Sequence, residues 1–343
     1  MKNIVRSQSI LAVLLVLVIA PASAQQGPRS RAFGAGNFFL ELGGVKTGFL
    51  RDFNGGDLKG EVVTFQAGSD HIQKKSLGRV SYSPINLQFG FAMDPSVYEW
   101  IANTWTGNFA RKDGSIHALD FNLQAKSQRQ FRNALLTEVT IPACDGSVKD
   151  PAYLAVKLVP QETKDLPAQG SVAEFNTRDL RARSWSPSHF RLKINGVDCT
   201  RVSKIESFTV KVKVEEFQSG QERIPGLVPT GVEFPNLKIT VLSSQAETWL
   251  SWFKDFVFLG IAGDDQEKEG TLEFLSPDLK TTLATITFHH LGIFSLSPEL
   301  LEEKACDCDF CDKKIAAESN TGIPKLTAEL YCERMEFAFA PGD

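Results

Sequence analysis

The sequence predicts a mainly β protein made of two tandem small β-barrels, each with one flanking α-helix. Three observations support this prediction. Most segments of the 343-residue chain alternate between apolar and polar residues. Each half also contains one stretch with helical spacing, and the two halves resemble each other at a nearly constant offset.

The alternation has the period of a half-buried β-strand, in which successive side chains point to opposite faces. Its clearest example is the segment 208–214, where Phe and Val residues alternate with Thr and Lys. The segments 237–241 and 284–288 follow the same pattern. Gly, Pro and Asn interrupt these runs at short intervals, which is typical of antiparallel sandwiches and barrels.

One helix is expected in each half. In the first half, Asp94 is a candidate N-cap, Pro95 occupies the first helical position, and the pattern stops near Gly107. In the second half, Ser244 and Glu247 have the spacing of a capping box. We expect the aromatic residues of both helices to pack against the barrels rather than to bind a ligand. The predicted helix core consists of Trp100, Trp105, Trp249, Trp252 and Phe253.

The two halves match weakly in sequence. Residues Phe38–Gly44 and Phe190–Gly196 lie 152 positions apart and share their pattern. Three further matches follow in the same order: Phe65–Asp70 with Phe217–Glu222, Asn86–Phe89 with Asn236–Ile239, and Leu119–Phe121 with Leu272–Phe274. The order and the spacing indicate a duplication. The alternative is two unrelated β domains of similar composition.

The N-terminus has the three parts of a secretory signal peptide, which we assign to residues 1–24. Lys2 and Arg6 give it positive charge, Ile10–Ala20 is apolar, and Ala22–Ala24 forms a small-x-small cleavage pattern. The apolar run is about half of the ~20 residues that a membrane-spanning helix needs. A secreted, periplasmic or extracellular location is expected; the alternative is an uncleaved anchor.

The remaining chain divides, by prediction, into a first barrel (25–160), a polar linker (161–188) and a second barrel (189–343) that carries a Cys-rich insertion (297–325). No later segment is apolar enough to span a membrane. The formal net charge is −4 and the basic residues form no stripe, so nucleic acid is not an expected partner.

Six cysteines follow the predicted cleavage site, and an even number in an exported chain indicates disulfides. The disulfide candidates are Cys144, Cys199, Cys306, Cys308, Cys311 and Cys332. The C-x-C-x-x-C cluster at 306–311 also has the ligand types of a zinc site, with Cys332 or a histidine as the fourth ligand. We expect disulfides there, and no cofactor.

Other candidate chemistry is sparse. His289 and His290 are adjacent, and a regular strand would point them to opposite faces, so a shared metal ion is not expected. The acidic run Asp264–Glu269 lacks the spaced ligands of a calcium loop and is expected to be a solvated loop. No nucleophile-elbow, zinc-protease or phosphate-loop motif occurs, so an enzyme is not expected. A hydrolase with dispersed carboxylates is the remaining enzymatic alternative.

The order of predicted elements carries a family resemblance. A strand, a glycine-punctuated hairpin, a strand, a helix with paired aromatic residues and further strands follow one another in each half. This order resembles the tail tube proteins of contractile phages and the haemolysin-coregulated protein of type VI secretion. The segments that carry the resemblance are Phe38–Gly44, Glu61–Gly68, Tyr82–Phe91, Val97–Ile101 and Leu119–Ile141, and their repeat from Phe190 to Ile293.

The resemblance implies barrels of the tail-tube type that assemble as sixfold rings and stack into a tube. With two barrels per chain, three chains would build one pseudo-sixfold ring. We therefore expect an exported structural protein that assembles with itself into rings, a tube or a filament. The hairpin arms Arg51–Lys75 and Ser203–Pro225 are expected to reach the neighbouring chain. The alternative is a secreted binding module or adhesin that recognises a glycan or a protein.

Overall fold

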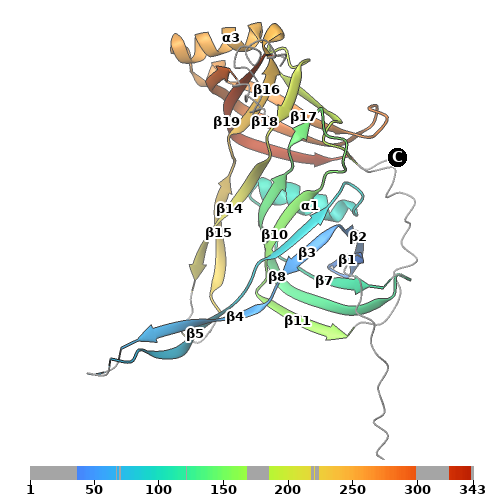
Figure 1. Cartoon of the computed structure of the whole chain (residues 1–343), viewed down its shortest axis with the longest axis vertical. Helices are drawn as coiled ribbons and strands as arrows, with labels where there is room; N and C mark the ends of the chain where they lie inside the picture. Colours follow the sequence, from blue (N-terminus) through green and yellow to red (C-terminus); the bar gives the residue numbers. More distant parts are fainter. Residues whose placement is uncertain are drawn as a thin grey trace, which may run out of the picture. The chain divides into compact units, whose positions relative to one another are not determined.

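A computed structural model describes residues 37–66, 68, 71–120, 122–167, 185–217, 220, 224–298 and 324–340 (Figure 1). These residues belong to one compact unit. The predicted signal peptide, most of the predicted linker and the cysteines at 306, 308 and 311 lie outside the described residues. The fold is mainly β, as the alternating pattern predicts.

In the described residues, the first half contains eleven strands and one helix. Their bounds are β1 (Asn37–Leu42), β2 (Val45–Leu50), β3 (Asp52–Gly55), β4 (Leu58–Phe65), β5 (Lys74–Tyr82), β6 (Ile85–Phe89), α1 (Pro95–Trp105), β7 (Lys112–Leu119), β8 (Ala125–Ile141), β9 (Cys144–Asp145), β10 (Leu154–Val159) and β11 (Glu162–Pro167).

The second half contains the remaining described strands and helices. Their bounds are β12 (Phe190–Ile194), β13 (Val202–Ile205), β14 (Phe208–Phe217), β15 (Gly226–Glu233), β16 (Leu237–Leu242), η1 (Ser243–Gln245), α3 (Glu247–Phe253), η2 (Lys254–Phe258), η3 (Asp264–Gln266), β17 (Lys268–Leu275), β18 (Thr282–Pro298) and β19 (Lys325–Phe339).

The strands form two large sheets and one small one. The first sheet runs β2-β1-β7-β8-β10-β6-β3, with β11 and β14 also paired to β8, and β15 paired to β14. The second sheet runs β12-β17-β18-β19-β16-β13-β9. Strands β4 and β5 pair only with each other among the described strands. All these strand pairs are antiparallel.

The two large sheets contain the same strand order. The path β1-β7-β8-β10-β6-β3 in the first half corresponds, strand by strand, to β12-β17-β18-β19-β16-β13 in the second. The hairpin β4–β5 has the chain position of β14–β15, and α1 has that of α3. Each half therefore follows one topology.

Local irregularities also recur at matching places. Strand β8 has a bulge with Asn133 at φ +50°, and β18 has one with His290 at φ +57°. In the first half, Gly114 lies opposite Phe131, and in the second, Gly270 lies opposite Phe288. A Cβ on Gly114 would lie 2.5 Å from the carbonyl oxygen of Glu41, so this position requires glycine.

The registers correct two of the four sequence matches. Leu40 pairs with Ile116, and its counterpart Leu192 pairs with Leu272, so Ile116 rather than Leu119 occupies the place of Leu272. The β6–β10 and β16–β19 registers likewise align Leu87 with Ile239 instead of Leu237. Both errors arise because strand segments of similar composition can be aligned in more than one register by sequence, whereas the hydrogen-bonded pairing allows only one.

The helices begin differently. The Asp94 side chain accepts a 2.9 Å hydrogen bond from the Ser96 backbone N–H, and Pro95 opens α1, as the sequence predicts. The predicted capping box of the second helix is wrong, because Ser244 lies in the 3₁₀ turn η1 and α3 begins at Glu247 without a side-chain cap. A π-helical turn, η2, follows α3.

The halves share one apolar core, in contrast to the predicted pair of barrels joined by a linker. Tyr98 of α1 stacks on Phe339 of β19, with ring centroids 4.0 Å apart. Trp185, within the predicted linker, is 2% exposed and packs edge-on against Phe91 and Phe274. The same range also contains β11, which pairs with β8. The structure therefore extends the packed region into residues expected to be a linker.

Candidate functional site

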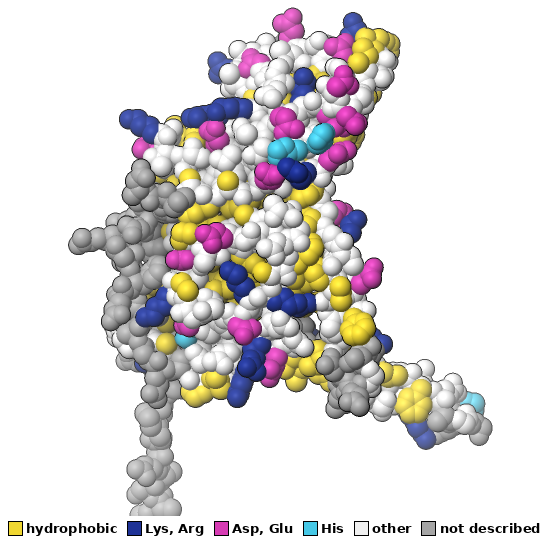
Figure 2. Space-filling view, turned by 180° about the vertical axis from the view of Figure 1, so that it is seen from behind, with side chains coloured by type: hydrophobic (Ala, Val, Ile, Leu, Met, Phe, Trp, Pro, Cys, Tyr) yellow, Lys and Arg dark blue, Asp and Glu magenta, His cyan; other side chains and the backbone are white. Residues whose placement is uncertain are grey.

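The β4–β5 hairpin exposes apolar side chains without covering a core. Every residue of β4 is exposed. Hydrophobic side chains are visible on this hairpin in the space-filling view (Figure 2). The exposed apolar residues are Leu58, Val62, Val63, Phe65, Ile72 and Leu77. A surface of this kind on a strand pair is typical of an interaction site.

The corresponding hairpin of the second half begins differently. Residues Phe208–Lys211 of β14 pair with Glu138–Ile141 at one edge of β8. Val210, opposite Val139, is 2% exposed. Its counterpart in β4, by the 152-residue offset, is Leu58, which is 58% exposed. One hairpin is therefore docked on a sheet edge and the other is not.

The counterpart of the docked edge lies at the end of β18. Bulges in both strands align Glu138–Ile141 of β8 with Ser295–Pro298 of β18. These β18 residues pair with β19 on one side and with no other described strand. Phe294 and Leu296 lie there, and Phe294 is 41% exposed. Among the described residues, the second half thus has an unpaired strand edge where the first half has β14.

The tip of the β14–β15 hairpin lies near the base of the β4–β5 hairpin. Arg79 of β5 and Glu216 of β14 form an exposed ion pair of 3.8 Å. The Arg111 guanidinium donates to the carbonyl oxygen of Leu227 in β15, and burial lowers the pKa of Arg111. A cleft between these strands is lined by Tyr82, Arg111, Phe217, Leu227 and neighbouring residues. Polar contacts thus tie β15 to the first half.

The predicted helix-core tryptophans Trp100 and Trp252 occupy the sixth position of α1 and of α3, and both are buried. A lysine ammonium lies over each ring: Lys112 at 5.5 Å from Trp100, and Lys268 at 5.3 Å from Trp252. Trp105 and Trp249 are also buried. The repeated lysine–tryptophan contact is a further match between the halves.

The apolar residues that follow Trp252 depart from the spacing of a straight helix. Phe253 is only partly buried against the core, and Val257 is 43% exposed. The π-helical turn η2 starts at Lys254 and changes the angular spacing of the residues after it. Phe256 is buried, whereas Phe258 is 80% exposed.

The three cysteines in the described part of the chain are unpaired, so the predicted disulfides do not form among them. Cys144 lies in β9, Cys199 precedes β13, and Cys332 lies in β19, so each belongs to a different element. Burial raises the pKa of Cys199 to about 11 and that of Cys332 to about 12. Protonated thiols of this kind are poor nucleophiles and poor metal ligands.

The prediction that His289 and His290 point to opposite faces is wrong. Phe288 and Leu291 are buried, His289 is partly exposed, and His290 is exposed. The bulge at His290 in the β17–β18 pairing reverses the alternation, so neither histidine points into the core. His289 Nδ1 lies 2.6 Å from Glu269, and His289 Nε2 lies 3.7 Å from Glu336.

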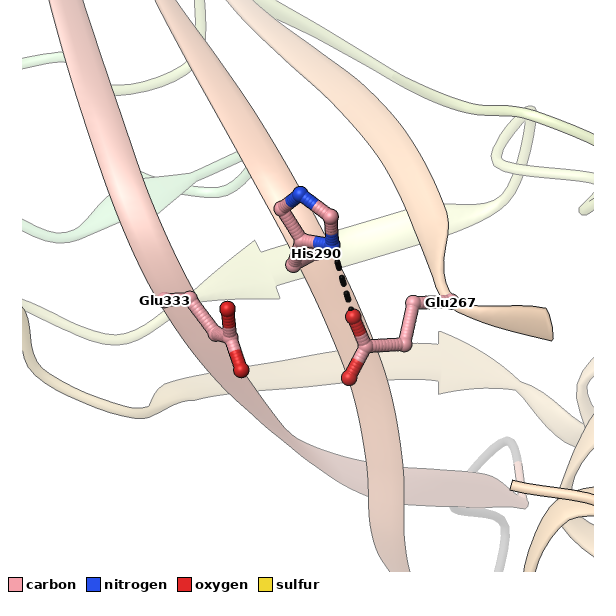
Figure 3. Close-up of side chains that lie close together, drawn as sticks. All are labelled: Glu267, His290 and Glu333. Atoms are coloured by element: carbon pink, nitrogen blue, oxygen red, sulfur yellow. Dashed lines mark hydrogen bonds and ion pairs between the residues drawn. The ribbon is translucent and has the colours of Figure 1, made fainter. Parts of the chain in front are cut away.

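His290 belongs to a separate cluster with Glu267 and Glu333, shown in Figure 3. One ligand atom from each residue lies within 4.8 Å of the others. His290 Nδ1 is 2.8 Å from Glu267, and this hydrogen bond raises the pKa of His290. The Tyr331 hydroxyl donates to the second oxygen of Glu267 at 2.6 Å. Burial, followed by this contact with Glu267, raises the pKa of Tyr331.

The acidic run Asp264–Glu269 is accordingly more than a solvated loop. Asp264 and Asp265 are exposed, as expected, but the Glu267 side chain is 7% exposed and bound by His290 and Tyr331. Residues 267, 290 and 333 are distant in sequence and come together only through the pairing register of β17, β18 and β19. The recurring Lys-Asp-Gly at 112–114 and Lys-Glu-Gly at 268–270 is the sequence signal that would have fixed this register.

Comparison with known proteins gives one family match. Residues 35–164 match the family of the T4-like virus tail tube protein gp19. This segment, which covers the first half, is phage tail tube-like, and the family is a structural one. No curated protein sequence matches the chain.

Among solved structures, similar chains occur in contractile injection systems. A chain of the sheath–tube complex of an extracellular contractile injection system in its extended state is 18% identical, with a TM-score of 0.36, covering 41% of this chain and 95% of that one. The tube-terminating cap of the anti-feeding prophage is 20% identical, with a TM-score of 0.37, covering 43% of this chain and all of that one. In the described residues, no helix has the length and apolar character of a membrane-spanning segment.

Proposed function

We propose that this chain is an exported structural protein, a tandem duplication of a tail tube-like unit, that assembles with itself into rings or a tube. The observation that carries the proposal is the family match of residues 35–164. The repeated strand order and the bulges at Asn133 and His290 support a second unit of the same kind in the second half. A duplication also accounts for the two lysine–tryptophan contacts.

The contact between neighbouring chains follows from the contact within one chain. The β14–β15 hairpin of the second half docks on β8, which is the first-half counterpart of β18. By the same geometry, the β4–β5 hairpin of the next chain would dock on the open end of β18. This addition would satisfy the unpaired backbone groups of β18 and cover Leu58.

The contact is heterologous, because a hairpin of one chain meets a strand edge of another. A heterologous contact closes into a ring or extends as a filament. The β14–β8 contact inside one chain would relate its two halves by the same rotation that the proposed contact applies between neighbouring chains. If that rotation is one sixth of a turn, three chains form a closed, pseudo-sixfold ring.

Electron microscopy of the purified protein tests the assembly. Rings or tubes built from pseudo-equivalent halves are the expected result, together with a concentration-dependent rise in mass by light scattering. A strictly monomeric protein across a wide range of concentration would refute the proposal and favour a secreted binding module instead.

Export rests on the charge, apolar run and small-x-small order of residues 1–24. We expect the exported protein to begin at Gln25, as measured by N-terminal sequencing. Recovery of the mature protein with Met1 in place would contradict cleavage, while leaving the assembly proposal intact.

A further inference from the structure

The cluster of Glu267, His290 and Glu333 has ligand atoms of the kinds that divalent transition metals bind (Figure 3). Glu267 directly precedes β17, His290 lies in β18 and Glu333 lies in β19, so three adjacent strands each supply one ligand. The β18–β19 register is regular from His289–Arg334 to Leu291–Cys332, which leaves His290 and Glu333 opposite each other. The bulge at His290 lies in the β17–β18 pairing.

At the strand positions of this cluster, the two halves have the same strand pairing but side chains of different chemistry. The counterparts of Glu267, His290 and Glu333 are Arg111, Asn133 and Gln161. In the first half, Arg111 donates to the Asn133 carbonyl at 3.1 Å, and the Asn133 amide donates to Gln161 at 2.5 Å. These three counterparts, a guanidinium and two amides, include no anionic ligand. The second half instead presents one imidazole and two carboxylates.

We propose that Glu267, His290 and Glu333 bind a divalent transition-metal ion such as Zn²⁺, in the second half only. Imidazole nitrogen and carboxylate oxygens bind zinc at about 2.0–2.2 Å. The ligand atoms all lie within 4.8 Å of one another, and the His290 and Glu333 residues are exposed. Three protein ligands leave at least one coordination position open to water or to another group.

The surroundings support this geometry. Tyr331 holds the second oxygen of Glu267, which fixes the carboxylate with its other oxygen directed at His290. Such an outer hydrogen bond orients a metal ligand. Glu269 and Glu336 lie beside the neighbouring His289 and add negative charge to this face, where Figure 2 shows histidines among acidic side chains.

Zinc binding to the full chain tests the proposal by isothermal titration calorimetry after dialysis against a chelator. All samples carry Cys306→Ser, Cys308→Ser and Cys311→Ser, so that the cysteine cluster cannot bind the ion. We expect one zinc per chain, and a loss of affinity of about tenfold or more in His290→Asn and in Glu333→Gln. Tyr331→Phe is expected to weaken binding by a smaller factor.

The first half provides the reason why these variants should fold. His290→Asn and Glu333→Gln reproduce Asn133 and Gln161, and Asn tolerates a positive φ. His289→Asn is the matched control and should keep the parent affinity and the parent melting temperature. Absence of zinc binding, equal binding in all variants, or loss in His289→Asn alone would overturn the proposal. None of these results bears on ring assembly.

Discussion

Replacing either helix tryptophan by alanine is expected to lower the free energy of unfolding by about 3–5 kcal/mol. Trp100 and Trp252 are 2% and 6% exposed, and each fixes its helix against the common core. Each substitution also removes a lysine–ring contact. Urea unfolding measures the loss as a lower transition midpoint.

The two tryptophans should respond differently to phenylalanine. Trp100 Nε1 donates to the Ala110 carbonyl at 2.7 Å, whereas Trp252 Nε1 has no hydrogen-bond partner among the described residues. Trp100→Phe should therefore cost about 1 kcal/mol more than Trp252→Phe. Phe258→Ala, at an 80% exposed position, is the control and should change stability by less than about 0.5 kcal/mol. A loss below ~1 kcal/mol for Trp252→Ala would show that α3 is not packed as described.

Charged substitutions at Leu58 or Leu296 are expected to prevent ring assembly. The proposed contact places these residues opposite each other, as Val210 and Val139 are within the chain. Leu58→Glu or Leu296→Lys would bury an unpaired charge between chains, which should weaken assembly by about tenfold or more. Analytical ultracentrifugation measures the change in apparent association constant.

The combination of the two substitutions provides the specific test. Leu58→Glu with Leu296→Lys creates an opposite-charge cross-strand pair and should recover part of the lost association. Leu250→Glu, at a 51% exposed position on α3, is the control and should assemble as the parent does. Leu58 is exposed, so Leu58→Glu should leave the melting temperature unchanged, whereas Leu296 packs partly against the core and Leu296→Lys should lower the melting temperature. Failure of the pair to recover association would place the contact elsewhere.

Sequence periodicity predicts the strands and the first helix because burial there depends on local alternation. The segment 208–214 and the Asp94 cap follow directly from residue type. The match between Phe38 and Phe190 also has the correct register. These features depend on residues that are close together in the sequence, so they can be predicted from it.

The pairing between strands is harder to predict from the sequence. The bulges at Asn133 and His290 shift the facing of the residues that directly follow them in β8 and β18, and no residue type marks them uniquely. The His290 cluster depends on that shift and on two strands distant in sequence. The shared core was also not predictable, because Trp185 lies in a polar segment without strand periodicity.

The pairing of β14 with β8 has a consequence for how assembly depends on concentration. This contact joins two halves of the same polypeptide, so it forms without a collision between molecules and is present at any dilution. In a ring of three chains, half of the six junctions would already exist in each monomer. The amount of closed ring would then rise with the third power of monomer concentration, whereas six separate units would require the sixth power. Ring formation would accordingly begin at far lower protein concentration than for an unlinked unit with the same contact strength.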